Sequence, residues 1–222
     1  YYSLLEYHGL AHRIATLQLP GTPAPYCFFG GVIFTKAGRE DLQGVRDLRG
    51  TRFCAVDRGS LGGWQAAKRE LVATGIDPVE DFQSLAFVGT HDAVVDAVLS
   101  GAADAGTVRS SQLEHMADEG RIRLDQIRVL HDQGPLSPEY PYLLSTRLYP
   151  EWPFAAVDGV DDALSKRVAI ALLTMDGEAE AATALGGAGW TIPQDYASVH
   201  ELLRELHEPP FSEIRSATLG EV

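Results

Sequence analysis

Short strand-like runs and longer stretches with helical spacing alternate along residues 28–132. Five runs have the length of strands, and they cover residues 28–35, 51–56, 84–89, 103–108 and 127–132. Between them, apolar residues recur three or four positions apart, as they do in a helix with one buried face. Strands that alternate with helices favour right-handed crossovers, so the pattern predicts an α/β region with a parallel sheet covered on both faces.

Capping residues support these helix boundaries. Gly75 is placed to end one helix in the left-handed conformation, and Thr90 can accept a hydrogen bond at the start of another. Ser111 and Glu114 have the spacing of a capping box, in which each side chain accepts from the other residue's backbone N–H. We therefore expect a further helix to begin at Ser111.

The remainder of the chain has a different pattern. Prolines are frequent around residues 134–153, which we expect to be irregular, and three helices are predicted at about residues 161–176, 178–186 and 197–207. Ser198 and Glu201 form a second capping box ahead of the last helix. Residues 209–222 offer little apolar surface to bury and are expected to be a linker.

The charge composition of the chain excludes some classes of binding partner. The 222 residues include 18 Lys and Arg against 31 Asp and Glu, a formal net charge of -13, which argues against binding nucleic acid or an anionic membrane. No apolar run approaches the roughly 20 residues that span a bilayer. The chain opens without an initiator Met or an export signal, so we expect it to be a processed or excised piece.

The two cysteines, Cys27 and Cys54, both lie within apolar runs. The favoured interpretation is two buried free thiols, and one disulfide between them is the alternative. Neither cysteine has a metal-type spacing to another Cys or to His, so no metal site and no cofactor are expected.

Three strand ends carry hydrogen-bond donors. In an open parallel sheet, ligands bind beyond the carboxyl ends of the strands, where the following helices present free N–H groups. The first strand end, residues 57–63, combines Ser60 with Gly62 and Gly63. The second carries Thr90 and His91, and the third carries Thr107 and Arg109. An oxyanion needs several donors and a positive local field, so this set predicts a site for a small anion.

Each of these residues also has a purely structural interpretation. The glycines could allow close packing between helix and strand, and His91 could be an ordinary residue of a first helical turn. Arg109 could pair with any of the many carboxylates. Because no nucleophile and base pair or other catalytic motif occurs in the sequence, an enzyme is not expected.

Two long stretches carry a family resemblance. DLRGTRFCAVDRGSLGGWQAAKRELVATGIDPVEDF and LAFVGTHDAVVDAVLSGAADAGTVRSSQLEHM resemble the second lobe of the phosphonate-type periplasmic solute-binding proteins. GTVRSSQLEHMADEG, LYPEWPFA and GWTIPQDYASVHELLRELHEPPF resemble a subgroup of that family, the extracytoplasmic sensor domains of tetrathionate-sensor-like histidine kinases. The resemblance covers nearly the whole chain.

The resemblance implies a type II periplasmic-binding-protein fold with two lobes and a hinge. Residues 33–132 would form the second lobe, and residues 1–32 with 133–222 would form a first lobe that lacks its N-terminal strands. The hinge is expected near residues 28–35 and 127–142. A homodimer would cover the sheet edge that such a shortened lobe exposes.

The resemblance also implies which residues contact the ligand in the cleft between the lobes. The family's hydroxyl-rich turn falls on residues 60–63, where Leu61 and Gly62 replace hydroxyl residues and so disfavour a phosphonate. The implied ligand-binding residues are Tyr2, Ser60, Gly62, Gly63, Trp64, Thr90, His91, Thr107 and Arg109.

The function expected from these observations is that of a periplasmic sensor domain. It would bind a small sulfur or phosphorus oxyanion and pass the signal to transmembrane and kinase regions beyond Val222, which would anchor it in the membrane. The alternative is a free solute-binding subunit that delivers its ligand to the permease of an ABC importer.

Overall fold

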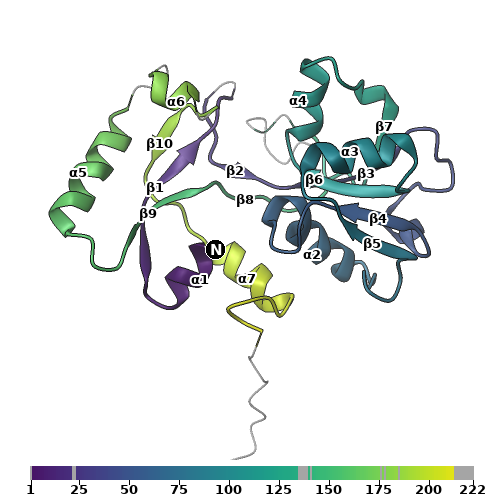
Figure 1. The fold of residues 1–222 in the computed structure, drawn as a ribbon, viewed down its shortest axis with the longest axis horizontal. Helices are drawn as coiled ribbons and strands as arrows, with labels where there is room; N and C mark the ends of the chain where they lie inside the picture. The colour runs from purple at the N-terminus through teal and green to yellow at the C-terminus, as the bar shows by residue number, and fades with distance from the viewer. Residues whose placement is uncertain are drawn as a thin grey trace, which may run out of the picture. The chain divides into compact units, whose positions relative to one another are not determined.

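The computed structural model describes residues 2–21, 24–134, 140, 142–175, 177, 179–184 and 186–212. The chain divides into unit 1, Tyr1–Phe28 with Tyr149–Val222, and unit 2, Phe29–Leu148. It passes between them through the short strands β2 (Phe28–Phe29) and β8 (Tyr149–Pro150), which pair with each other (Figure 1). The return crossing thus lies after the range 127–142 that we predicted for the hinge.

A five-stranded sheet organises unit 2, in the order β5-β4-β6-β3-β7. Its strands are β3 (Gly31–Lys36), β4 (Arg52–Ala55), β5 (Ser84–Phe87), β6 (Ala105–Arg109) and β7 (Ile127–Leu130). Strand β4 runs parallel to β5 and β6, whereas β3 runs antiparallel to β6 and β7.

The prediction of a wholly parallel sheet is therefore wrong for one strand. The four strands joined by helical crossovers share one direction, as expected. Strand β3 runs the other way because the connection to β4 contains only a short 3-10 turn at Val45–Leu48 instead of a crossover helix. In consequence the first residue of β3, Gly31, lies beside the last residue of β6, Arg109.

Helices cover both faces of this sheet. Strand residues alternate between two buried clusters, since Phe53 belongs to one and Cys54 to the other. Helices α3 (His91–Ser100) and α4 (Gln112–Asp118) pack on the Cys54 side, and α2 (Ala66–Ala73) packs on the Phe53 side. Short 3-10 and π-helical turns lie at Leu124–Gln126 and Leu61–Gln65.

Most of the predicted caps of unit 2 are confirmed. Thr90 accepts a hydrogen bond from the N–H of Ala93 at 3.1 Å, and Gly75 follows α2 with a φ of 84°. The capping box at Ser111 is wrong, because Ser111 has a φ of 72° and its side chain caps nothing. An N-cap needs an extended backbone to aim its side chain at the first turn. Glu114 instead accepts from the N–H of Leu143 at 2.6 Å.

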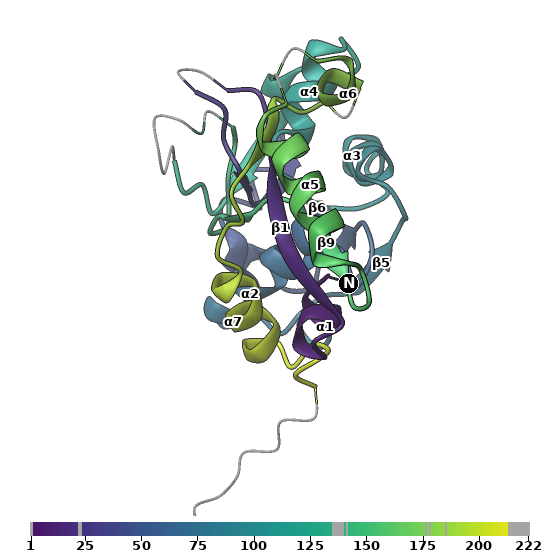
Figure 2. The same cartoon turned by 90° about the vertical axis from the view of Figure 1, so that its left-hand side faces the viewer.

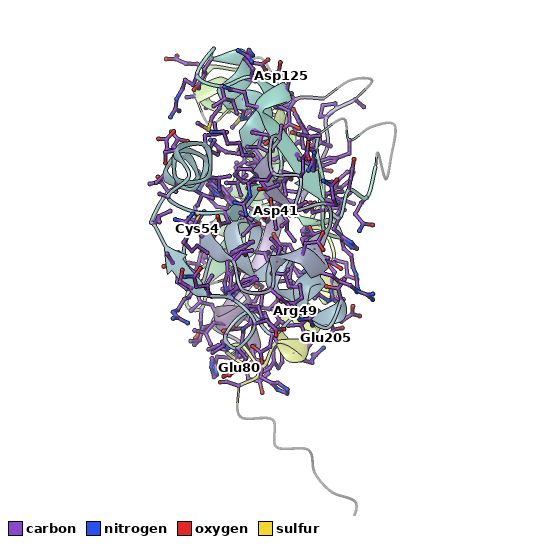
Figure 3. The ribbon with its side chains drawn as sticks, turned by 90° about the vertical axis from the view of Figure 1, so that its right-hand side faces the viewer. Asp41, Arg49, Cys54, Glu80, Asp125 and Glu205 are labelled. Carbon is purple, nitrogen blue, oxygen red and sulfur yellow. The ribbon has the colours of Figure 1, made fainter. Side chains whose placement is uncertain are left out.

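Both cysteines are free thiols, as the favoured interpretation predicted. Cys54 is buried in unit 2 and Cys27 is half-buried in unit 1. Burial raises the pKa of the Cys54 thiol to about 12. In Figure 3, Cys54 lies between Asp125 and Glu80, which are near the far ends of unit 2.

Unit 1 contains a three-stranded antiparallel sheet in the order β10-β1-β9, formed by β1 (Ala11–Gln18), β9 (Pro153–Val157) and β10 (Gly189–Thr191). Its helices are α1 (Tyr2–Tyr7), α5 (Asp162–Leu173), α6 (Glu180–Ala184) and α7 (Ala197–Glu205). Figure 2 shows α5 running alongside β1. None of the helices that the structure describes is long and apolar enough to cross a membrane.

Two expectations for unit 1 are corrected. The proline-rich passage contains strand β8 and the first residue of β9, because Pro153 begins an edge strand, a position that tolerates proline. Helix α7 begins at Ala197, and Asp195 accepts from its N–H at 2.9 Å, so Ser198 and Glu201 form no capping box. The predicted irregular stretch 135–139 and most of the predicted linker, 213–222, lie outside the described residues.

Candidate functional site

The turn after β4 brings backbone and side chains very close together. The hydroxyl of Ser60 accepts a hydrogen bond from the N–H of Gly63 at 3.1 Å. A Cβ on Gly63 would lie 2.6 Å from Cγ2 of Val56, and one on Gly62 would lie 2.9 Å from the ring of Phe29. Both glycines are therefore required by packing, which supports the structural interpretation of this turn. The Ser60 hydroxyl keeps its own proton for a further partner.

Trp64 was predicted to contact the ligand, and the structure buries its side chain in unit 2. Its side chain is 3% exposed and packs edge-on against Phe87, with the ring centroids 5.5 Å apart. It also contacts Phe53 in the apolar cluster beneath α2. The indole is large and apolar, so its burial contributes to the core of unit 2 and leaves no surface for a ligand.

The other two strand ends meet in a single contact. The backbone N–H of Arg109, at the end of β6, donates to Nδ1 of His91, at the start of α3, at 3.2 Å. Because Nδ1 accepts this bond, a neutral His91 carries its proton on Nε2. Burial, and then the charge of Arg109, lower the pKa of His91 below its ordinary value. His91 is thus a neutral hydrogen-bond donor at neutral pH.

Arg109 lies over an aromatic ring. Its guanidinium carbon is 4.3 Å from the centroid of Phe29, and a Cβ on Gly62 would lie 3.2 Å from its own Cβ. A stacked guanidinium keeps its N–H groups in the plane of the group, where they can bind an anion. Arg109 therefore lies beside the glycine turn and beside His91.

Thr107 occupies the same face of β6 as Arg109, two residues earlier. Its side chain is fully buried, and its hydroxyl finds no hydrogen-bond partner among the residues that the structure describes. A Cβ on Gly31 would approach this hydroxyl to 3.7 Å. A buried hydroxyl without a partner costs free energy, so Thr107 is suited to gain one from a bound molecule or a water.

The remaining predicted residues have other structural roles. The Thr90 hydroxyl caps α3. Tyr2 belongs to unit 1, where its hydroxyl donates to Glu6 at 2.8 Å and its ring packs edge-on against Tyr196. The assignment of Tyr2 to the ligand site stays a prediction.

Two residues near this site were missed by the sequence analysis. Phe29 supports Arg109, and Arg58 lies over the ring of Phe87 with its guanidinium carbon 4.8 Å from the centroid. The signal that could have indicated Arg58 is a cation directly after a strand end and directly before a glycine turn.

The groups at this edge of the sheet are mainly donors and cations. They are the Ser60 hydroxyl, the Nε2–H of His91 and the guanidinium of Arg109. The nearby carboxylate of Asp92 is already engaged, by the side-chain amide of Gln112 at 2.8 Å and by Arg121 at 2.7 Å. Donors that surround a cation are the chemistry of an anion site.

Comparison with known proteins assigns the chain to a family. Residues 8–199 match the family model of the periplasmic substrate-binding proteins of phosphonate ABC transporters. The chain belongs to this family. Its predicted type II periplasmic-binding fold is confirmed by solved structures of phosphonate-binding proteins.

Three known proteins are similar to this chain in sequence or in fold. The tetrathionate sensor histidine kinase of Salmonella typhimurium is 35% identical to this chain over 183 residues. These residues are 82% of this chain and 29% of the kinase, so the chain spans less than a third of the length of the kinase. A Xanthomonas citri protein solved with bound ATP has a TM-score of 0.66 at 20% identity, over 91% of this chain and 72% of the other. PhnD1 of Prochlorococcus marinus, solved in complex with methylphosphonate, has a TM-score of 0.64 at 17% sequence identity. The similarity covers 89% of this chain and 72% of PhnD1.

Proposed function

We propose that this chain is the periplasmic ligand-binding domain of a two-component sensor kinase and that it binds a small sulfur or phosphorus oxyanion. The proposed contacts in unit 2 are Ser60, Gly62, His91, Thr107 and Arg109. The observation that carries the proposal is the 3.2 Å hydrogen bond from the N–H of Arg109 to Nδ1 of His91. This bond joins two strand ends and leaves the proton of a neutral His91 on Nε2.

The physical argument is one of charge and donors. An oxyanion loses its hydration when it binds, and only several donors at fixed positions compensate for that loss. The glycine turn, the imidazole and the guanidinium each come from a different loop, so a ligand that contacts all three is selected by shape and by charge. Leu61 and Gly62 leave the turn with one hydroxyl, that of Ser60, which favours a weakly basic oxyanion over a phosphonate.

The sensor role is supported by the identity of 35% to a sensor histidine kinase over most of this chain. A second candidate is a free substrate-binding protein of an ABC importer, which the description of the family itself favours. The gene that encodes this chain distinguishes them. A transmembrane helix and a kinase region encoded after Val222 would support the sensor, and a stop codon there would support the importer.

The anion site is tested by titration calorimetry with sulfate, thiosulfate, tetrathionate, phosphate, methylphosphonate and acetate. We expect at least one sulfur or phosphorus oxyanion to bind. Arg109→Gln should weaken that binding about thirty-fold, because hydrogen bonds to a charged group contribute about 2 kcal/mol.

The matched control for Arg109→Gln is Arg123→Gln, which removes the same charge. Arg123 is 73% exposed and pairs with Asp125 at 3.0 Å, close to the start of β7 at the opposite edge of the sheet. Absence of heat with every anion, or equal weakening by the two variants, would contradict the proposal.

A further inference from the structure

Arg58 is an exposed cation at the end of β4 that the structure of unit 2 does not otherwise require. Its guanidinium lies 4.8 Å above the ring of Phe87, the last residue of β5. The neighbouring carboxylate of Asp57 accepts the N–H of Gly59 at 2.8 Å and so belongs to the turn. Arg58 forms no ion pair with any described residue, although acidic residues outnumber basic ones in this chain.

Arg58 belongs to the turn after β4, and Arg109 lies beside the same turn, where a Cβ on Gly62 would lie 3.2 Å from its own Cβ. The turn follows β4, which is the neighbour of β5 on one side and of β6 on the other. Arg58 is held over Phe87 at the end of β5, and Arg109 ends β6 and is held over Phe29 at 4.3 Å. Both guanidiniums are thus supported by an aromatic ring at the carboxyl edge of the same sheet.

A guanidinium that lies over an aromatic ring is held there by attraction to the ring face. The cation is attracted to the ring face, and the five N–H groups stay in the plane of the guanidinium. Two such groups at one turn, each held over a different ring, match a ligand that carries negative charge at both ends. A ligand with a single charged end can neutralise only one of them.

We propose that Arg58 is a second cationic contact of the anion site and that the site therefore prefers a dianion charged at both ends to a monoanion. The inference rests on the proposed anion-binding function and adds to it the charge and the shape of the ligand. Arg109, beside His91, would hold one end of the ligand. Arg58 would hold the other end and set the preference between the two charge types.

Methanesulfonate and ethanedisulfonate are suitable probes, because they carry one and two sulfonate groups and both stay fully ionised. Calorimetry of the whole chain at low ionic strength compares wild type with Arg58→Gln. We expect ethanedisulfonate to bind wild type about five-fold more tightly than methanesulfonate, the size expected for one partly exposed ion pair. Arg58→Gln should abolish this ratio and leave methanesulfonate affinity within about two-fold.

Arg123→Gln is the control for the change in net charge, and it should leave the ratio as in wild type. If wild type binds ethanedisulfonate no more tightly than methanesulfonate, or if Arg58→Gln leaves the ratio unchanged, the role of Arg58 is overturned and the anion function stands. If wild type binds none of the anions in the larger panel either, the anion function itself fails, and the role of Arg58 fails with it.

Discussion

The two units of this protein are stabilised by different interactions. Unit 2 has a sheet with a buried apolar cluster on each face, and its polar groups gather where the strands end. The main sheet of unit 1 has three strands, and most of the large apolar side chains that are exposed among the described residues belong to this unit, including Trp152 and Ile192 at 63% and 65% exposure. The difference indicates that unit 2 has the more complete core.

Unit 1 is held instead by polar contacts between segments far apart in the sequence. Glu6 in α1 lies 3.2 Å from a guanidinium nitrogen of Arg13 and 3.1 Å from Nε2 of His200 in α7. Arg13 also lies over the ring of Tyr196, with its guanidinium carbon 5.1 Å from the centroid. These contacts join α1 and β1 to α7 and its flanking residues, so charged groups contribute to holding this unit together.

The largest expected effect is on the packing of unit 2. Gly63→Ala places a methyl group 2.6 Å from Cγ2 of the buried Val56, and such overpacking destabilises by about 3 kcal/mol. Gly38→Ala is the control, because nothing lies within 4 Å of a Cβ there. The loss of stability is measured as reduced protection of the backbone amides of β4 and β6 against hydrogen exchange. Equal protection in the two variants would show that the turn is not tightly packed.

The next effect concerns acid stability in unit 2. Asp104 accepts hydrogen bonds from Arg52 at 2.9 Å and from Arg39 at 2.6 Å, and these bonds hold the pKa of Asp104 well below its usual range. A lowered pKa means that the carboxylate stabilises the fold above its unfolded pKa of about 3.9, and that this contribution is lost as the pH falls below that value.

Asp104→Asn should therefore cost about 2 kcal/mol at neutral pH and progressively less below about pH 4. Asp125→Asn, which removes a surface pair with both side chains more than 70% exposed, should cost less than about 0.5 kcal/mol. Urea unfolding at several pH values gives both numbers. A cost at Asp104 that does not depend on pH would contradict the assignment.

The smallest expected effect is in unit 1. Glu6→Gln keeps an acceptor for the Tyr2 hydroxyl but removes the charge that faces Arg13 and His200, so we expect a loss of about 1 kcal/mol. Hydrogen exchange in α1 and α7 reports it. Glu201→Gln, on the exposed face of α7, is the control. If the two variants lose equal protection against hydrogen exchange, the charge of Glu6 does not stabilise unit 1.

These contrasts also explain how far the sequence predicts the fold. The strands and helices of unit 2 follow from hydrophobic spacing, because most of its elements bury one or both faces. The direction of β3 was not predicted, since it depends on the connection to β4, which contains a short 3-10 turn instead of a crossover helix. The strands of unit 1 were missed because β1 has a weak alternation of buried and exposed residues and because prolines flank β9.

The predicted site residues differ in how far the sequence indicates their structural surroundings. His91 and Arg109 are joined as the strand-end argument requires, although that argument cannot give the tautomer of the imidazole. Trp64 follows the turn in sequence, but a large apolar ring gains more by burial than by exposure, so it packs in the core. Arg58 was missed because its ring partner, Phe87, belongs to another strand.

The central claim is that His91 and Arg109 present donors to one anion, and nitrogen-15 NMR of the His91 ring and the Arg109 amide tests it most directly. We expect a neutral imidazole protonated on Nε2 near neutral pH. Addition of the tightest-binding anion of the panel should shift both the His91 Nε2 and the Arg109 amide signals. A proton on Nδ1, or signals that do not move while the anion binds, would contradict this account.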